Sequence, residues 1–250
     1  MNTGHINQTD KDTPYSAFVT GGGGSIGRQV CKRLAEDGFQ VIAADIAEPA
    51  DLHGKFITQQ LDVRNSASVE AAFDNAEQHG NLKALAICHG TIKYTDVEKA
   101  VDEDIWAITD INLLGVARIL RAATRRLIDN GSIVIISSVV ASMGRARGAF
   151  MYTATKAGVE SLTRTYAVAL GMRGVRVNAV APGFLSVPMG GEGVRMRAEQ
   201  GGDEALLPFS PMGRLPTPKE VAEVVAFLCS SRASGISGAV IPVDAGQRAL

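Results

Sequence analysis

Short apolar segments alternate with longer segments of helical periodicity along almost the whole chain. The apolar segments lie at residues 16–20, 40–44, 56–61, 84–88, 132–136, 175–180 and 239–243. Helical patterns lie between them, among others at 25–37, 66–78, 97–128 with one break, 152–171 and 218–230. Strands and helices in alternation require βαβ crossovers, which make a parallel sheet with helices on both faces. We therefore expect a doubly wound (Rossmann-type) α/β fold with a mostly parallel sheet.

A single domain accounts for this alternation, because no linker or sequence repeat interrupts residues 15–246. The polar residues 1–14 predict a flexible N-terminal tail, which leaves one domain at 15–250. A stretch rich in glycine and proline at about 185–211 predicts a mobile lid. The chain has 250 residues, 46% of them apolar, and is long enough to bury a core without disulfides or metal ions.

The balance of charge argues against several classes of partner. The chain has 25 Lys and Arg against 26 Asp and Glu, and a net charge of −1. It therefore has no excess of positive charge to attract nucleic acid or an acidic membrane surface. Uncharged runs such as Gly131 to Gly144 are too short to span a bilayer. We expect no nucleic-acid partner and no membrane partner.

Cysteine and histidine usage predicts a cytoplasmic protein without a metal site. The three cysteines form no disulfide framework, and the N-terminus has no apolar segment typical of a signal peptide. The four histidines lack metal-ligand spacing. Cys88 and His89 are adjacent, and on a strand they would point to opposite faces of the sheet.

The sequence Thr20-Gly-Gly-Gly-Gly-Ser-Ile-Gly27 joins the first predicted strand to the first predicted helix. Glycines there allow a sharp turn and a close approach of the backbone to a diphosphate at the helix N-terminus. A plain turn is the alternative. Asp45 ends the second strand, where its carboxylate can bind adenosine ribose hydroxyls and repel a 2′-phosphate, or serve as a turn residue. No Lys or Arg lies within Gly21–Ile26, so NAD is favoured over NADP.

A tyrosine and a lysine four residues apart, Tyr152 and Lys156, share one face of a predicted helix. A tyrosine whose pKa is about 10 needs a stabilised anion to act as a base near neutral pH. A neighbouring ammonium, or the positive nicotinamide ring of an oxidised cofactor, lowers that pKa. A surface pair is the alternative reading. Ser137 and Ser138 end the fifth strand, and either could bind a reacting oxygen.

Several motifs in register resemble the roughly 250-residue branch of the short-chain dehydrogenase/reductase family over residues 15–246. The matching positions are Thr20–Gly27, Asp45, Asn112, Ser138, Tyr152, Lys156, 176–183 (RVNAVAPG) and 238–246. The resemblance implies a dinucleotide-binding catalytic domain with Tyr152 as general acid and base. It also implies that Lys156 binds the nicotinamide ribose and lowers the pKa of Tyr152, and that Ser138 orients the substrate oxygen. Asn112 would hold a water in a proton relay, or would be a helix-kink residue.

The resemblance also implies the cofactor site. Asp62 and Val63 would flank the adenine, although Asp62 could instead be an N-cap or turn carboxylate. Pro182, Gly183 and the residues after them would line the nicotinamide pocket. The full set expected to bind cofactor is Gly21, Gly24, Ser25, Ile26, Gly27, Asp45, Asp62, Val63, His89, Gly90, Tyr152, Lys156, Pro182, Gly183, Leu185 and Val187.

The chain departs from the family pattern at four places. Ser25 replaces a glycine of the turn, and Val187 replaces a threonine after Pro-Gly, where Ser186 could substitute. The family's N-N-A-G stretch reads Ile87-Cys-His-Gly90, which keeps the glycine and loses the asparagine side chains. Tyr152 follows Ser138 by one residue more than is usual in the family, so we expect a bulge within 141–150.

These features predict an NAD-dependent oxidoreductase that transfers hydride between nicotinamide and a secondary alcohol or ketone. The expected substrate residues are Met143, Arg145, Arg147 and Phe184; the two arginines would bind an anionic substrate or lie in solvent. A dehydratase or epimerase is the alternative enzyme, and a non-catalytic NAD-binding sensor or scaffold is the alternative class. The family resemblance suggests a homotetramer (or homodimer).

Overall fold

The computed structural model describes residues 14–54, 56–94, 97–143, 149–187, 199 and 201–250. Seven parallel strands form one sheet in the order β3-β2-β1-β4-β5-β6-β7. The strands are β1 (Tyr15–Thr20), β2 (Gln40–Asp45), β3 (Ile57–Gln60), β4 (Asn81–Ile87), β5 (Ser132–Ile136), β6 (Arg176–Pro182) and β7 (Val240–Val243). The predicted doubly wound α/β fold is confirmed.

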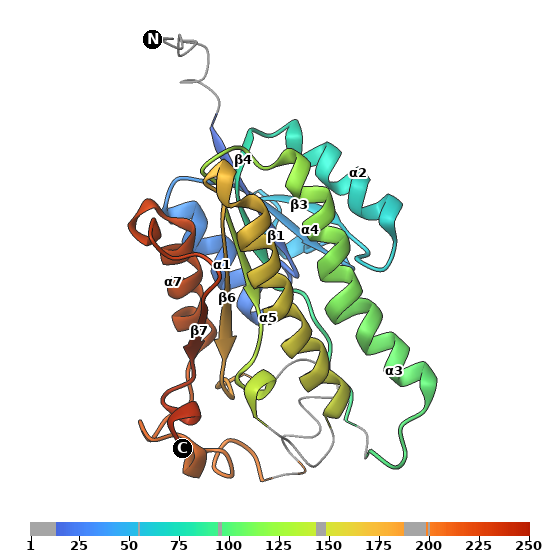
Figure 1. The fold of residues 1–250 in the computed structure, drawn as a ribbon, viewed down its shortest axis with the longest axis vertical. Helices are drawn as coiled ribbons and strands as arrows, with labels where there is room; N and C mark the ends of the chain where they lie inside the picture. Colours follow the sequence, from blue (N-terminus) through green and yellow to red (C-terminus); the bar gives the residue numbers. More distant parts are fainter. Residues whose placement is uncertain (1–13, 55, 95–96, 144–148, 188–198, 200) are drawn as a thin grey trace.

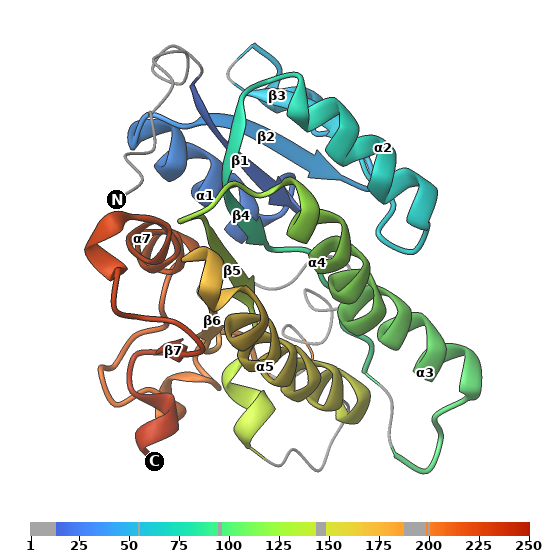
Figure 2. The same ribbon diagram turned by 45° about the horizontal axis from the view of Figure 1, so that its top comes forward.

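Helices cover both faces of the sheet (Figures 1 and 2). The longer helices are α1 (Ser25–Glu36), α2 (Ser66–Glu77), α3 (Asp102–Thr109), α4 (Gly115–Arg126), α5 (Phe150–Leu170) and α7 (Pro218–Cys229). Short helical turns are η2 (Ala50–Leu52), η3 (Asp110–Leu114), η4 (Val139–Ser142), η5 (Gly171–Arg173), η6 (Leu207–Phe209), η7 (Ser231–Ala233) and η8 (Gln247–Ala249). No helix in the described part of the chain is both long enough and apolar enough to cross a membrane.

Successive side chains of a strand point to opposite faces of the sheet, so the buried side chains form one cluster on each face. On β1, Phe18 packs with α2, α4 and α5, whereas Ala17 and Val19 pack with α1 and α7. Phe18 stacks on Phe73 of α2, with ring centroids 4.6 Å apart. All strands run in one direction, so their carboxyl ends meet at one edge, the lower edge in Figure 1. The chain reverses its winding between β1 and β4, and open parallel sheets bind ligands at that point of the edge.

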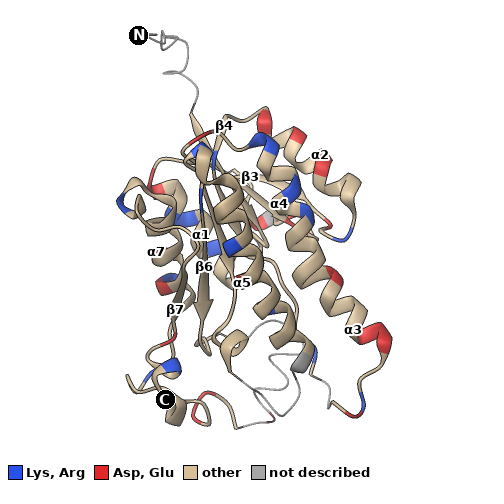
Figure 3. Ribbon diagram, viewed as in Figure 1, with Lys and Arg blue, Asp and Glu red and all other residues tan. Residues whose placement is uncertain are grey.

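Charged side chains tie α2 to α4 on the outer surface, where Figure 3 shows acidic residues on the first helix and basic residues on the second. Arg126 bonds to Glu70 at 2.8 Å, and Arg125 lies 3.1 Å from the same carboxylate. These pairs are partly exposed, so each contributes little to stability. They lie at the end of the molecule away from the carboxyl edge.

The break predicted within 97–128 is a turn of π-helix, η3, between α3 and α4. A π turn places one extra residue in the helix and often marks a functional site. Its central residue, Asn112, is completely buried. Two strands depart most from the expected bounds: β4 begins at Asn81, where polar residues precede the apolar run, and β6 extends to Pro182.

Candidate active site

A cavity of about 600 Å³ opens at the carboxyl edge, from the glycine turn to Tyr152. Most residues predicted from the sequence line it together. They are Gly21, Gly24, Ser25, Ile26, Gly27, Asp45, Asp62, Val63, His89, Gly90, Ser138, Tyr152, Lys156, Pro182, Gly183, Phe184, Leu185 and Val187. Elements far apart in the sequence thus converge on one site.

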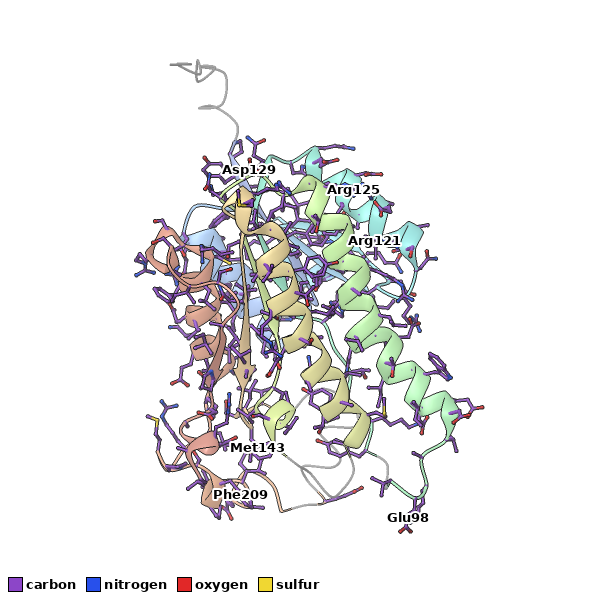
Figure 4. All side chains as sticks on the ribbon, in the orientation of Figure 1. Glu98, Arg121, Arg125, Asp129, Met143 and Phe209 are labelled. Carbon is purple, nitrogen blue, oxygen red and sulfur yellow. The ribbon has the colours of Figure 1, made fainter. Side chains whose placement is uncertain are left out.

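Two predicted positions, Asn112 and Met143, do not line the cavity, and two others lie outside the described residues. Asn112 lies behind the cavity wall, and Met143, 41% exposed, lies outside the lining at the lower end of the molecule (Figure 4). Arg145, Arg147 and most of the predicted bulge lie outside the described residues. Within the segment 185–211, Leu185, Val187, Gly202 and Leu206 line the cavity.

The glycine turn is built so that few side chains could replace its glycines. Gly21 has a φ of +67°, and a Cβ there would lie 2.6 Å from the His89 backbone nitrogen. A Cβ on Gly27 would lie 2.0 Å from the Gly21 carbonyl oxygen. Gly24 is the N-cap of α1, and no side chain caps this helix or adds negative charge to its first turn. The first-turn N–H groups are therefore open to an anion, which fits the diphosphate of a dinucleotide.

Backbone amides fix the carboxylate of Asp45 at the end of β2. Its Oδ2 accepts a hydrogen bond from Gly23 N at 2.9 Å, and its Oδ1 accepts one from Ile46 N at 2.7 Å. A side chain at position 23 would crowd this carboxylate, since a Cβ there would lie 3.0 Å from Oδ2. The carboxylate is thus held beside the glycine turn, where ribose hydroxyls of a dinucleotide would meet it.

Asp62 also lines the cavity, but Arg64 occupies its carboxylate. The Arg64 guanidinium donates to both oxygens at 2.9 and 2.8 Å, and Arg64 N adds a third hydrogen bond at 2.9 Å. Hydrogen bonding by Arg64 lowers the pKa of Asp62. The N-cap of α2 is Asn65, so Asp62 is a turn carboxylate rather than a helix cap.

Tyr152 and Ser138 meet across the cavity, whereas Ser137 points elsewhere. Ser138 is hydrogen-bonded to the Tyr152 phenol. Ser137 Oγ donates to Glu160 Oε1 at 2.9 Å and is buried. Of the two serines that the sequence offered, Ser138 therefore lies where a substrate oxygen could bind, and Ser137 joins β5 to α5.

Burial moves the pKa values of Tyr152 and Lys156 in opposite directions. Burial raises the pKa of Tyr152 to about 12, while the hydrogen bond from Ser138 lowers it and the nearby Tyr94 raises it further. Burial lowers the pKa of Lys156 to about 8. The Lys156 ammonium donates to the Ile136 carbonyl at 2.8 Å and lies 5.6 Å from the Tyr152 ring centroid. The groups of the chain alone therefore do not produce the lowered phenol pKa that the sequence suggested.

Asn112 holds the loop after β4 by two backbone hydrogen bonds. Its Oδ1 accepts from Thr91 N at 2.8 Å, and its Nδ2 donates to Thr91 O at 2.8 Å. A Cβ on Gly90 would lie 3.4 Å from Asn112 Oδ1 and 3.5 Å from Lys156 Nζ, so this loop passes beside both side chains. The structure supports the kink alternative for Asn112, and a water relay through it stays a prediction.

The expectation for Cys88 and His89 needs a correction. We expected a strand to point these side chains to opposite faces, but β4 ends at Ile87 and both residues line the same cavity. The chain leaves the pleated conformation there as it crosses the sheet edge. Within the described part of the chain, no group of three or more His, Cys, Asp or Glu residues could hold a metal ion.

The sequence pointed to the wall near Tyr152 only in part: Ala149 and Leu206 fall within the stretches 141–150 and 185–211 that were expected to build the pocket, whereas Ile92, Tyr94 and Val140 were not identified. Ile92, Tyr94, Val140, Ala149 and Leu206 line this end of the cavity, and the first four pack in one cluster with Tyr152. These residues follow β4, follow β5, precede α5 or come from the segment after 200, and no spacing motif connects them. For Ile92, Tyr94 and Val140, the signal available from sequence is their position soon after strands of a parallel sheet.

Comparison with known proteins gives matches over nearly the full chain. A family model described as enoyl-(acyl carrier protein) reductase matches residues 22–248. The cis-4-hydroxycyclohexanecarboxylate dehydrogenase of Sinomonas cyclohexanicum is 36% identical, with 94% of this chain and 96% of that protein covered. A 3-oxoacyl-(acyl carrier protein) reductase of Thermotoga maritima is 34% identical, with 92% and 96% covered. Ligand-free aldohexose dehydrogenase of Thermoplasma acidophilum superposes with a TM-score of 0.85 at 30% identity, with 95% of both chains covered.

Proposed function

Because the chain belongs to the short-chain dehydrogenase/reductase family of oxidoreductases, we propose that it is an NAD-dependent dehydrogenase acting on a secondary alcohol, or on the matching ketone in reverse. The observation that carries this proposal is the convergence of Ser138, Tyr152 and Lys156 on the cavity that begins at the glycine turn. The names of its relatives support the reaction class, since they include dehydrogenases and a 3-oxoacyl reductase.

In this proposal the side chains around Tyr152 manage the proton. NAD would supply the hydride acceptor and, when oxidised, a positive ring charge that favours the phenolate. Ser138 donates to the substrate oxygen and orients it toward the Tyr152 phenol. Tyr152 takes the hydroxyl proton during oxidation and returns it during reduction. Lys156 stabilises the phenolate electrostatically and binds a ribose hydroxyl of the cofactor. The Asn112 side chain keeps the loop at Thr91 in place beside them.

NAD preference rests on the charges near Asp45. The carboxylate is held beside the glycine turn, where it would repel a 2′-phosphate. Arg28 lies near it, but the Arg28 guanidinium is paired with Asp51 and donates through Nε to Gly23 O at 2.6 Å. Arg64, at the same end of the cavity, is paired with Asp62. Both guanidinium groups thus already have carboxylate partners.

The walls around the reacting end favour a substrate with an apolar body. Ile92, Val140, Ala149 and Leu206 surround that end, with Phe184 close to the cofactor residues. We propose a cyclic or branched secondary alcohol there. The interaction of Arg145 and Arg147 with an anionic substituent stays a prediction. We also propose a cytoplasmic protein, consistent with three free cysteines.

Replacing Tyr152 tests the proposed chemistry. Tyr152→Phe should lower kcat at least about 100-fold with a panel of secondary alcohols, because the proton acceptor is lost. The dissociation constant for NAD, measured by calorimetry, should stay within about twofold. Tyr166→Phe, the same change elsewhere on α5, should keep full activity. If Tyr152→Phe turns over normally, the acid and base assignment is wrong; if the unaltered protein binds NAD and oxidises no alcohol, the sensor alternative gains support.

Replacing Asp45 tests the cofactor preference. Asp45→Ala should raise the affinity for NADP relative to NAD by about tenfold or more, because it removes a carboxylate facing the 2′ position. Asp37→Ala removes a carboxylate from the opposite end of α1 and should leave the ratio unchanged. If the ratio of NAD affinity to NADP affinity is the same in Asp45→Ala and in the unaltered protein, the proposed role of Asp45 is refuted.

A further inference from the structure

His89 is a partly exposed residue at the edge of the cofactor cavity, and its imidazole has one bonded and one unbonded ring nitrogen. Its Nδ1 lies 2.7 Å from Thr20 Oγ1, at the last residue of β1. Its Nε2 is buried and has no hydrogen-bond partner among the described residues. An unpartnered buried polar atom is costly, so its position beside a ligand cavity calls for a physical reason.

The hydrogen of the Thr20 hydroxyl decides which ring nitrogen of His89 carries the proton, and it places that proton on Nε2. Thr20 is completely buried, and Nδ1 of His89 is the partner found for its hydroxyl in the described part of the chain. If Nδ1 carried the proton, the Thr20 hydroxyl would accept, and its own hydrogen would have no acceptor. The hydroxyl therefore donates to Nδ1. Burial lowers the pKa of His89 to about 3, with a further lowering by Lys156, so the ring is neutral and Nε2 is a donor.

The place of His89 indicates which acceptor this donor would meet. Its backbone packs against Gly21 in the turn that fits a diphosphate, and the next residue, Gly90, lies beside Lys156. The carbonyl of Ile111 raises the pKa of the ring but does not lie in hydrogen-bond geometry with Nε2. The ring thus lies between the diphosphate end and the Lys156 end of the cavity.

We propose that His89 positions the cofactor: its Nε2–H donates a hydrogen bond to an oxygen of bound NAD between the diphosphate and the nicotinamide ribose, and Thr20 sets the tautomer. This inference rests on the proposed function. His89 stands at the alanine of the family's N-N-A-G stretch, and an alanine side chain cannot form a hydrogen bond.

Two replacements of His89 separate the roles of its nitrogens. In His89→Gln the amide nitrogen reaches about as far as Nε2, so NAD affinity should stay within about threefold. In His89→Asn the amide reaches only as far as Nδ1, so the contact with Thr20 survives and the contact with NAD is lost. NAD should then bind about tenfold more weakly by calorimetry. Equal affinity in His89→Asn and the unaltered protein would overturn the proposal.

Thr20 variants give an independent measurement should His89→Asn fail to fold. Thr20→Val removes the hydroxyl that keeps the ring proton of His89 on Nε2, so this variant should bind NAD more weakly. Thr20→Ser keeps the hydroxyl and should bind NAD normally. Combined with His89→Asn, Thr20→Val should have no further effect on NAD affinity. If Thr20→Val lowers NAD affinity by the same factor in the unaltered protein and in His89→Asn, then Thr20 does not act through His89, and the proposed coupling between the two residues is refuted. If the unaltered protein binds neither NAD nor NADP, the proposed function itself fails along with this inference; normal binding with no effect of any variant refutes His89 alone.

Discussion

At the scale of single residues, the site holds two buried ionisable groups in unfavourable surroundings. Lys156 is 3% exposed and Tyr152 7% exposed, and burial favours the neutral form of each. The pKa of Lys156 falls to about 8, and that of Tyr152 rises to about 12. A charged ammonium near neutral pH therefore costs folding free energy, which is expected where chemistry rather than stability determines the residue.

Lys156→Met should reveal this cost through its pH dependence. The pKa of Lys156 falls from 10.5 in the unfolded chain to about 8 in the folded chain. Between these values the unfolded state binds the extra proton, so the lysine's penalty is full below about pH 8 and is relieved as pH rises toward 10.5. The unfolding free energy of the unaltered protein should rise relative to Lys156→Met by up to about 3 kcal/mol. Urea unfolding at several pH values measures this difference; a constant difference would contradict it.

How far the sequence could predict the site is clear at these same residues. Spacing was sufficient to bring Tyr152 and Lys156 to one cavity, because residues four apart share a helix face. It could not give the direction in which the pKa of Tyr152 moves, since that depends on burial by Val139, Val140 and Ala149 from other elements. The local pattern left Ser137 and Ser138 as alternatives, and only the family resemblance favoured Ser138. The structural reason is a tertiary contact that the pattern does not show, the hydrogen bond from Ser137 to Glu160 of α5.

At the scale of elements, the turn before α1 and the π turn before α4 both shape the cavity. The first depends on local chemistry, since only glycine fits Gly27 against the Gly21 carbonyl. The second depends on a tertiary contact, since Asn112 bonds Thr91 across the gap to the loop after β4. The sequence therefore predicted the first in detail. For the second it predicted a break, with a kink at Asn112 as one alternative, and not the contact with Thr91.

Gly27→Ala should disrupt the turn and weaken NAD binding at least about tenfold. The new Cβ would lie 2.0 Å from the Gly21 carbonyl oxygen, so the turn would have to move away from the N-terminus of α1. Gly171→Ala is the matched control, because nothing lies within 4 Å of its Cβ position. That change should alter the unfolding free energy by less than about 0.5 kcal/mol. Unchanged NAD affinity in Gly27→Ala, measured by calorimetry, would show that the turn does not bind the cofactor.

At the scale of the whole molecule, apolar side chains that do not line the cavity remain exposed. Val168 lies on α5, the helix that faces the viewer in Figure 1, and is 84% exposed, and Met172 in the following turn η5 is 99% exposed. Trp106 on α3 is 65% exposed. Single exposed apolar residues are common, but contact with another copy would cover these large side chains, which motivates a prediction about assembly.

The prediction at this scale is a homotetramer (or homodimer) in solution. Light scattering should give a mass two or four times that of the 26.3 kDa chain. Val168→Asp should lower that mass, because a contact between copies would bury an unpaired carboxylate. Lys32→Asp, at an exposed position on α1, is the control and should keep the assembled mass. A monomeric mass for the unaltered protein would contradict the prediction while leaving the site untouched, since the described lining of the cavity comes from one chain.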